Sequence, residues 1–250
     1  MYHQFKELAD LDITKEPMEI GPTTHYIMGG IRVDADSQQS SIPGLFAAGE
    51  CASGINGANR LGGNSLSDLI VFGKRAGEYA SEFARKNGQA RVDDGAVQRA
   101  LTASLEPFER GDAGENPYKV QADLQDTMQA LVGIVRLENE MQDALTRIQE
   151  FKARAARVGV IGHREYHAGW HTCLDLRNLL TVAECITRSA IERKESRGGH
   201  FREDYPAKAD EFGKFNIVTR QGAGGRVEIS HVPIPPMPDY LKEVIEEQKS

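Results

Sequence analysis

The stretch INGANRLGGNSL, at residues 55–66, gathers glycines and asparagines around one arginine and leads directly into an apolar helical pattern. A glycine-rich turn that opens a helix usually holds an anion, because the first N–H groups of the helix lack intrahelical partners and lie at the positive end of its dipole. We expect Asn64 or Ser65 to cap a helix that runs to about Lys86. Arg60, on the same turn, carries a planar guanidinium suited to a carboxylate. A structural turn with Arg60 on the surface is an equally supported alternative.

Residues 57–62 also supply the G-x4-G frame of a phosphate-binding P-loop, but this frame is incomplete. Gly63 and Asn64 stand where lysine and a hydroxyl residue would be needed, so both the phosphate-binding charge and the magnesium ligand are missing. No G-x-G-x-x-G stretch opens a helix elsewhere in the sequence. The pattern therefore argues against an NTPase and against a complete dinucleotide site.

Two further residues are candidates for binding chemistry. His25 precedes a Gly-Gly turn in THYIMGG, residues 24–30, although a lone histidine is more often structural. Glu50 ends the apolar stretch GLFAAGE, residues 44–50, which is predicted to be a short buried strand closed by a tight turn. A carboxylate at a strand end can accept hydrogen bonds from the hydroxyls of a ribose or ribitol chain.

The composition is that of a globular protein with one or two domains: 250 residues, 40% hydrophobic and 27% charged. A formal net charge of −7 argues against a nucleic-acid partner. No apolar run approaches the roughly 20 residues that a membrane span needs, and the N-terminus lacks the pattern of a signal peptide. Three widely spaced cysteines fit a reducing compartment. We therefore expect a soluble, intracellular protein.

The chain divides into four regions that differ in composition and hydrophobic pattern, residues 1–20, 21–88, 89–196 and 197–250. Together they predict an α+β fold. The third region is predicted to be helical, with starts near Asp93 or Asp94 and at Asn116. Two apolar stripes there have the spacing of packed antiparallel helices: Leu124, Met128, Leu131 and Val135, then Leu137, Met141, Leu145 and Ile148.

A last long helix is expected at about residues 174–195, after a connector that contains HREYHAGWH. His163, His167 and His171 lie four apart, as zinc ligands on one helix face would, but two flanking glycines favour a polar connector over a metal site. The fourth region contains KFNIVTR and RVEISHV, which predict a β-hairpin, and it ends in a short acidic helix.

Four blocks in order, THYIMGG, GLFAAGEC, NGANRLGGNSL and ESRGGHFREDYP, resemble the flavoprotein subunit of succinate dehydrogenase and fumarate reductase. The resemblance covers the C-terminal portion of that subunit, less than half of it. It implies the end of a capping domain at residues 1–20, the C-terminal segment of an FAD-binding α/β domain at 21–88, a helical bundle at 89–196 and a hairpin-containing arm at 197–250. The glycine-rich block is shared with L-aspartate oxidase, which is one alternative.

The resemblance also implies roles for individual residues. His25 and Arg60 would bind the carboxylates of a C4 dicarboxylate, succinate or fumarate. Glu50 would contact FAD, and Asn64, Ser65 and Leu66 would lie against the flavin ring. A helix N-terminus there would stabilise the negative charge of a reduced flavin. His200 and Arg202 are expected to dock the C-terminal segment onto the rest of the chain.

The implied partners are an iron–sulfur subunit and membrane anchor subunits that pass electrons to a quinone, on the cytoplasmic side of the cell membrane. The sequence departs from the family pattern in having Asn56 before Gly-Ala-Asn-Arg. The family's dinucleotide fingerprint, its FAD-linking histidine and its proton-transfer arginine match nothing in the sequence, so an inactive C-terminal fragment is expected. A stand-alone helical interaction module is the alternative from a different functional class.

Overall fold

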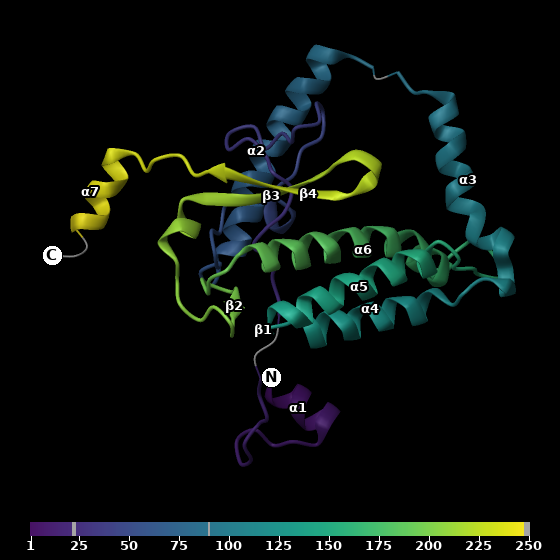
Figure 1. Cartoon of the computed structure of the whole chain (residues 1–250), viewed down its shortest axis with the longest axis horizontal. Coiled ribbons are helices and arrows are strands. Elements are labelled where there is room, and N and C mark those ends of the chain that lie inside the picture. Colours follow the sequence, from purple (N-terminus) through teal and green to yellow (C-terminus); the bar gives the residue numbers. More distant parts are fainter. Residues whose placement is uncertain (22–23, 90, 248–250) are drawn as a thin grey trace.

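The computed structural model describes residues 1–21, 24–89 and 91–247 (Figure 1). Its α-helices are α1 (Tyr2–Ala9), α2 (Asn64–Asn87), α3 (Asp94–Arg110), α4 (Pro117–Leu131), α5 (Glu138–Ala155), α6 (Ala168–Glu192) and α7 (Asp239–Glu247). Its strands are β1 (Val135–Arg136), β2 (Phe201–Arg202), β3 (Phe215–Gln221) and β4 (Val227–Pro233). Short 3-10 helices lie at η1 (Gly49–Cys51), η2 (Gly111–Ala113), η3 (Asp210–Gly213) and η4 (Ala223–Gly225). This mixture of helices and small sheets agrees with the predicted α+β class.

Helices α4, α5 and α6 lie side by side and enclose the main hydrophobic core (Figure 1). The predicted apolar stripes contribute Leu124 and Ile148 to this core and Met141 to a second, smaller cluster. The prediction is wrong for Val135, which lies in β1 and is 52% exposed. The reason is that α4 ends at Leu131, and the Arg136 side chain donates to the carbonyls of residues 132 and 133 just beyond that end.

Local capping residues set several helix starts as expected. Asp93 caps α3 by accepting hydrogen bonds from two backbone N–H groups, and Asn116 caps α4 in the same way ahead of Pro117. Helix α6 begins at Ala168, earlier than predicted, because the His167 side chain accepts a hydrogen bond from the backbone of Trp170. The prediction that Asn64 or Ser65 caps α2 is wrong: Gly63 is the N-cap, and no side chain caps this helix.

Strands β3 and β4 pair antiparallel, which confirms the predicted hairpin, and they contact α6. The predicted strand at residues 44–50 is wrong. Phe46 forms only an isolated bridge with Gln39, and the chain then enters η1. Gly49 has φ +75°, a left-handed conformation that ends extended structure.

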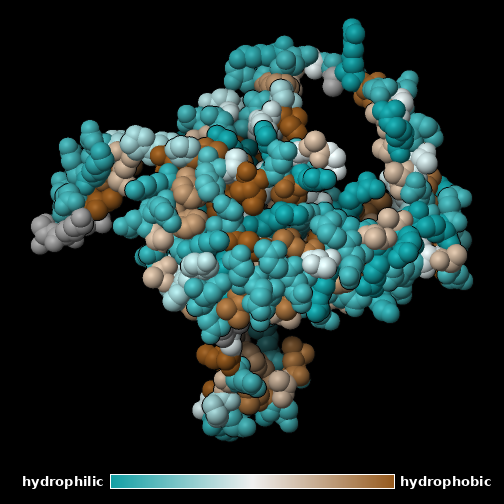
Figure 2. Space-filling view, in the orientation of Figure 1, coloured by the Kyte–Doolittle hydropathy of each residue, from teal (hydrophilic) through white to brown (hydrophobic). Residues whose placement is uncertain are grey.

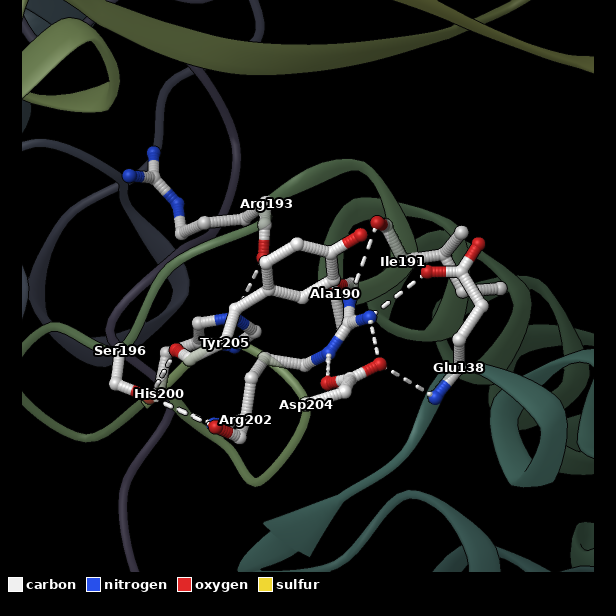
Figure 3. Close-up of polar contacts among 9 residues, drawn as sticks. All are labelled: Glu138, Ala190, Ile191, Arg193, Ser196, His200, Arg202, Asp204 and Tyr205. Atoms are coloured by element: carbon white, nitrogen blue, oxygen red, sulfur yellow. Dashed lines mark hydrogen bonds and ion pairs between the residues drawn. The ribbon is translucent and has the colours of Figure 1, made fainter. Parts of the chain in front are cut away.

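The segment after α6 is joined to the helices through Arg202, as expected (Figure 3). Arg202 is fully buried, and its guanidinium donates to Asp204 at 2.6 and 2.7 Å and to Glu138 at 2.8 Å. It also donates to the carbonyls of Ala190 and Ile191, near the C-terminal end of α6. A cation there complements the negative end of the helix dipole.

Figure 2 shows the hydropathy of the face seen in Figure 1: hydrophilic residues predominate over α4 and α5, whereas hydrophobic residues gather around α2 and the hairpin. Several apolar side chains of α2 are exposed, among them Leu66, Leu69 and Ile70. Within the described ranges, no helix has both the length and the apolar character required to cross a bilayer.

Candidate functional site

Three segments meet around the glycine-rich loop, residues 55–63. The segment before it in sequence, residues 24–31, is tied to η1 because the Ile27 N–H donates to Glu50 Oε1 at 3.0 Å. The Ile31 N–H donates to the Cys51 carbonyl at 2.7 Å. The same segment reaches the loop, since the Arg60 N–H donates to Met28 Sδ at 3.2 Å. The structure therefore brings the segment of His25, the turn of Glu50 and the loop of Arg60 together.

Arg60 is half-buried, and its guanidinium lies over the Tyr26 ring at 4.6 Å from the ring centre. One guanidinium nitrogen donates to the adjacent Leu61 carbonyl at 3.4 Å. Its Nε is buried and has no hydrogen-bond partner, and no carboxylate of the described residues pairs with this cation. A buried donor without a partner costs about 1–3 kcal/mol, so the site favours an incoming acceptor such as a carboxylate.

The N-terminus of α2 follows this loop directly. Gly63 holds φ +83°, and Asn64 and Leu66 are exposed while Ser65 is half-buried. The Asn64 N–H donates to the Leu61 carbonyl at 3.2 Å, and no side chain caps the helix. This terminus fits the electron-rich edge of a flavin, which would supply the missing acceptors.

His25 is exposed. It directly precedes Tyr26, whose ring lies under the Arg60 guanidinium. Glu50 is also exposed, and one of its carboxylate oxygens is occupied by the Ile27 N–H. The second oxygen leaves Glu50 capacity to accept a bond from a ligand hydroxyl. The residues predicted from the sequence therefore lie on adjoining segments. The sequence did not indicate that Glu50 also holds the segment of His25 in place.

Sequence reasoning missed several residues that hold the loop. Tyr26 and Met28 contact Arg60, as described above, and Asn56 Nδ2 donates to Asp68 Oδ2 at 3.1 Å. Asp68 is only 7% exposed and lies on α2, so this bond joins the loop to the helix it precedes. Asn64 and Ser65 lie one helical turn before Asp68, so its polar character did not set it apart in the sequence.

The histidine-rich connector is polar, as favoured from its sequence. Both ring nitrogens of His167 are occupied: Nδ1 accepts from the Trp170 N–H at 3.0 Å, and Nε2 donates to the Ile161 carbonyl at 2.8 Å. Neither ring nitrogen is therefore free to bind a metal ion. In the part of the chain that the structure describes, no three His, Cys, Asp or Glu side chains are grouped for metal binding.

Comparisons with known proteins identify the family. Residues 121–245 match the family described as "Fumarate reductase flavoprotein C-term", and residues 1–66 match the "FAD binding domain" family. The fumarate reductase flavoprotein subunit of Escherichia coli is 37% identical over 240 residues, covering 93% of this chain and 40% of that protein.

Two solved structures are similar over nearly the whole chain. Mycobacterium smegmatis Sdh1 in complex with UQ1 has a TM-score of 0.88 and 49% identity, over 98% of this chain and 42% of its own. A quinol–fumarate reductase with menaquinol molecules has a TM-score of 0.82 and 35% identity, over 95% of this chain and 42% of its own.

The chain spans about 40% of the length of the curated relatives it matches. The region that matches the FAD-binding family ends at residue 66, so it includes the glycine-rich loop and the first residues of α2. The chain belongs to the family of FAD-dependent succinate dehydrogenase and fumarate reductase flavoprotein subunits.

Proposed function

We propose that this chain forms the carboxylate-binding side of a site that interconverts succinate and fumarate. The observation that carries the proposal is the half-buried guanidinium of Arg60, with a buried Nε that has no partner. A fixed, unpaired guanidinium suits one carboxylate of a C4 dicarboxylate. His25, on the segment that holds Tyr26 beneath Arg60, would donate a hydrogen bond to the substrate's other carboxylate.

FAD supplies the hydride-transfer chemistry when it is bound. Glu50 would accept hydrogen bonds from its hydroxyl groups, and Asn64, Ser65 and Leu66 would present the α2 N-terminus to its ring. The contribution of this chain is to bind and orient the dicarboxylate beside the flavin. Orientation of this kind can supply several kcal/mol of the barrier reduction.

We further propose that electrons pass from the flavin to an iron–sulfur subunit and then, through membrane anchor subunits, to a quinone at the inner face of the cell membrane. Support comes from the solved relatives, one of which is in complex with UQ1 and another of which contains menaquinol molecules. The proton-transfer arginine that the family resemblance implies matches nothing in the sequence. We therefore expect the 250-residue chain by itself to be inactive.

The first test is Arg60→Lys in the native protein that contains this chain. Lysine keeps the charge but loses the bidentate fork, so we expect kcat/KM for succinate and for fumarate to fall by about 100-fold. Flavin absorbance should remain, because Arg60 is assigned to substrate.

The matched control is Arg99→Lys, on an exposed arginine of α3 that pairs with Asp93 at the surface. Turnover should be unchanged in this variant. Equal turnover of both dicarboxylates by the Arg60→Lys protein and the unaltered protein would exclude the proposed role.

A further inference from the structure

The sequence Arg-Gly-Gly-His at residues 197–200 forms a two-residue hairpin turn. The backbones of Arg197 and His200 exchange two hydrogen bonds, of 2.8 and 3.1 Å. Gly198, the first central residue, has φ +59°, the left-handed value that a type II′ turn requires at this position. The Gly199 N–H then donates to the Ala58 carbonyl at 3.0 Å. The tip of this turn therefore touches the loop that carries Arg60.

The contact depends on the absence of a side chain at Gly198. A Cβ added there would overlap the carbonyl oxygen, the carbonyl carbon and the Cβ of Ala58. Two backbones thus meet directly, and Ala58 precedes Arg60 by two residues. A shift of the Ala58 peptide is expected to move the guanidinium, because few bonds separate the two.

The N-terminal side of the turn is anchored by a buried carboxylate. Glu195 has no exposed surface, and it accepts two hydrogen bonds from the Arg197 guanidinium, at 2.8 and 2.9 Å. It also accepts from Arg193 at 2.7 Å and from the Ala209 N–H at 2.9 Å. Such charge-assisted, multiply bonded pairs hold a fixed geometry.

The C-terminal side is anchored through His200. Its Nδ1 accepts from the Arg136 guanidinium at 2.8 Å. Its Nε2 donates to the Arg193 carbonyl at 3.0 Å (Figure 3). Arg136 is held in turn by the carbonyls of Val132 and Gly133, each at 3.0 Å. The turn is consequently fixed to the ends of α4 and α6 before it reaches the loop.

We propose that the Gly198–Gly199 turn is a positioning element for Arg60: it sets the backbone of the glycine-rich loop from the side of the helical bundle. The loop is held from two other directions, by the Asn56–Asp68 bond to α2 and by Met28. The turn supplies the third point of support. This inference rests on the proposed function, since it assigns Arg60 to the substrate carboxylate.

The test is Gly198→Ala in the native protein, with succinate and fumarate as substrates. The new Cβ should push Ala58 away and displace Arg60, and a displacement of about 1 Å in a substrate-positioning group can cost around 100-fold in kcat/KM. Because Arg60 contacts the carboxylate before and during the reaction, we expect KM to rise by about 10- to 100-fold while kcat changes much less. The inhibition constant of malonate, a non-reactive dicarboxylate, should rise in parallel.

The matched control is Gly224→Ala. Gly224 also has a positive φ, +66°, but a Cβ added there would meet nothing within 4 Å. Both variants therefore place a Cβ on a residue with positive φ, and only one of them meets the loop. Unchanged KM in Gly198→Ala, with a clear defect in Arg60→Lys, would overturn the positioning role while leaving the proposed function intact. An Arg60→Lys protein without a defect would instead overturn the proposed function.

If Gly198→Ala does not fold, His200→Asn decides the question. It loosens the anchor on the bundle side without filling the contact with Ala58, so KM should rise by about two- to fivefold with flavin content retained. An unchanged KM in a folded His200→Asn protein would then count against the turn as a positioning element.

Discussion

Arg202 has no exposed surface, yet each of its guanidinium nitrogens donates at least one hydrogen bond. Its acceptors come from three segments: Glu138 at the start of α5, the carbonyls at the end of α6, and Asp204 on its own segment. Removal of one partner from a buried charge network typically costs about 3–5 kcal/mol, because the remaining groups lose their compensation.

We therefore expect Arg202→Ala to lower the free energy of unfolding by roughly 3 kcal/mol, measured by urea denaturation. The control is Arg220→Ala, whose ion pair with Glu228 lies at the surface, with the two side chains 74% and 44% exposed. An exposed pair contributes at most about 1 kcal/mol. Equal losses in the two variants would show that burial of Arg202 contributes nothing.

At the scale of the elements, burial is unevenly distributed. Helices α1 and α7 contain no buried residue, and α3 buries only Pro107, whereas α6 buries eight residues. Local opening is easiest where few apolar contacts must be broken. We predict that in this chain the amide protons of α1 and α7 exchange fastest and those of α6 slowest, as measured by hydrogen-exchange mass spectrometry. Protection of α7 equal to that of α6 would contradict the argument.

The elements that the sequence predicted are those fixed by neighbouring residues. Asp93 and Asn116 cap their own helices, and the β3–β4 hairpin needs only two strands and the turn between them. Val135 was misplaced because the helical period of α4 continues in the sequence beyond the end of the helix. The parallel pairing of β1 with β2 joins residues far apart in the chain, so no local pattern indicated it.

At the scale of the whole molecule, the same distinction applies to the site. The glycine-rich loop and Arg60 could be predicted from the sequence because a glycine-rich turn before a helix and an arginine within that turn are local features. The contact between Gly199 and Ala58 could not, since it depends on how the C-terminal segment docks onto the bundle. The docked segment also contains His200 and Glu195, two groups that make the folding stability depend on pH.

Burial lowers the pKa of His200 from 6.5 to about 4, although its bond to the Arg193 carbonyl opposes the shift, and Arg136, Arg193 and Arg202 lower it further. Burial alone would raise the pKa of Glu195, but hydrogen bonds from Arg197, the Ala209 N–H and Arg193 outweigh it and lower this pKa from 4.5 to about 2. Both groups therefore take up a proton more readily in the unfolded chain than in the folded one. Stability attributable to His200 is present above pH 6.5 and is lost as the pH falls toward 4, and that of Glu195 is lost between pH 4.5 and 2.

Measurements at pH 7 and pH 5 separate the effect of His200 from that of Glu195, because the stability attributable to Glu195 is lost only below pH 4.5. From the two pKa values of His200, we expect the free energy of unfolding to fall by roughly 2 kcal/mol between these pH values on its account. His200→Asn cannot take up the proton, so its loss over the same interval should be smaller than that of the unaltered protein by this amount. All other titrating groups are common to the two proteins and cancel in the comparison. If the free energy of unfolding fell equally in both proteins, His200 would take up its proton in the folded molecule without a cost in stability. The contact of its ring with Arg136 would then not restrain the turn.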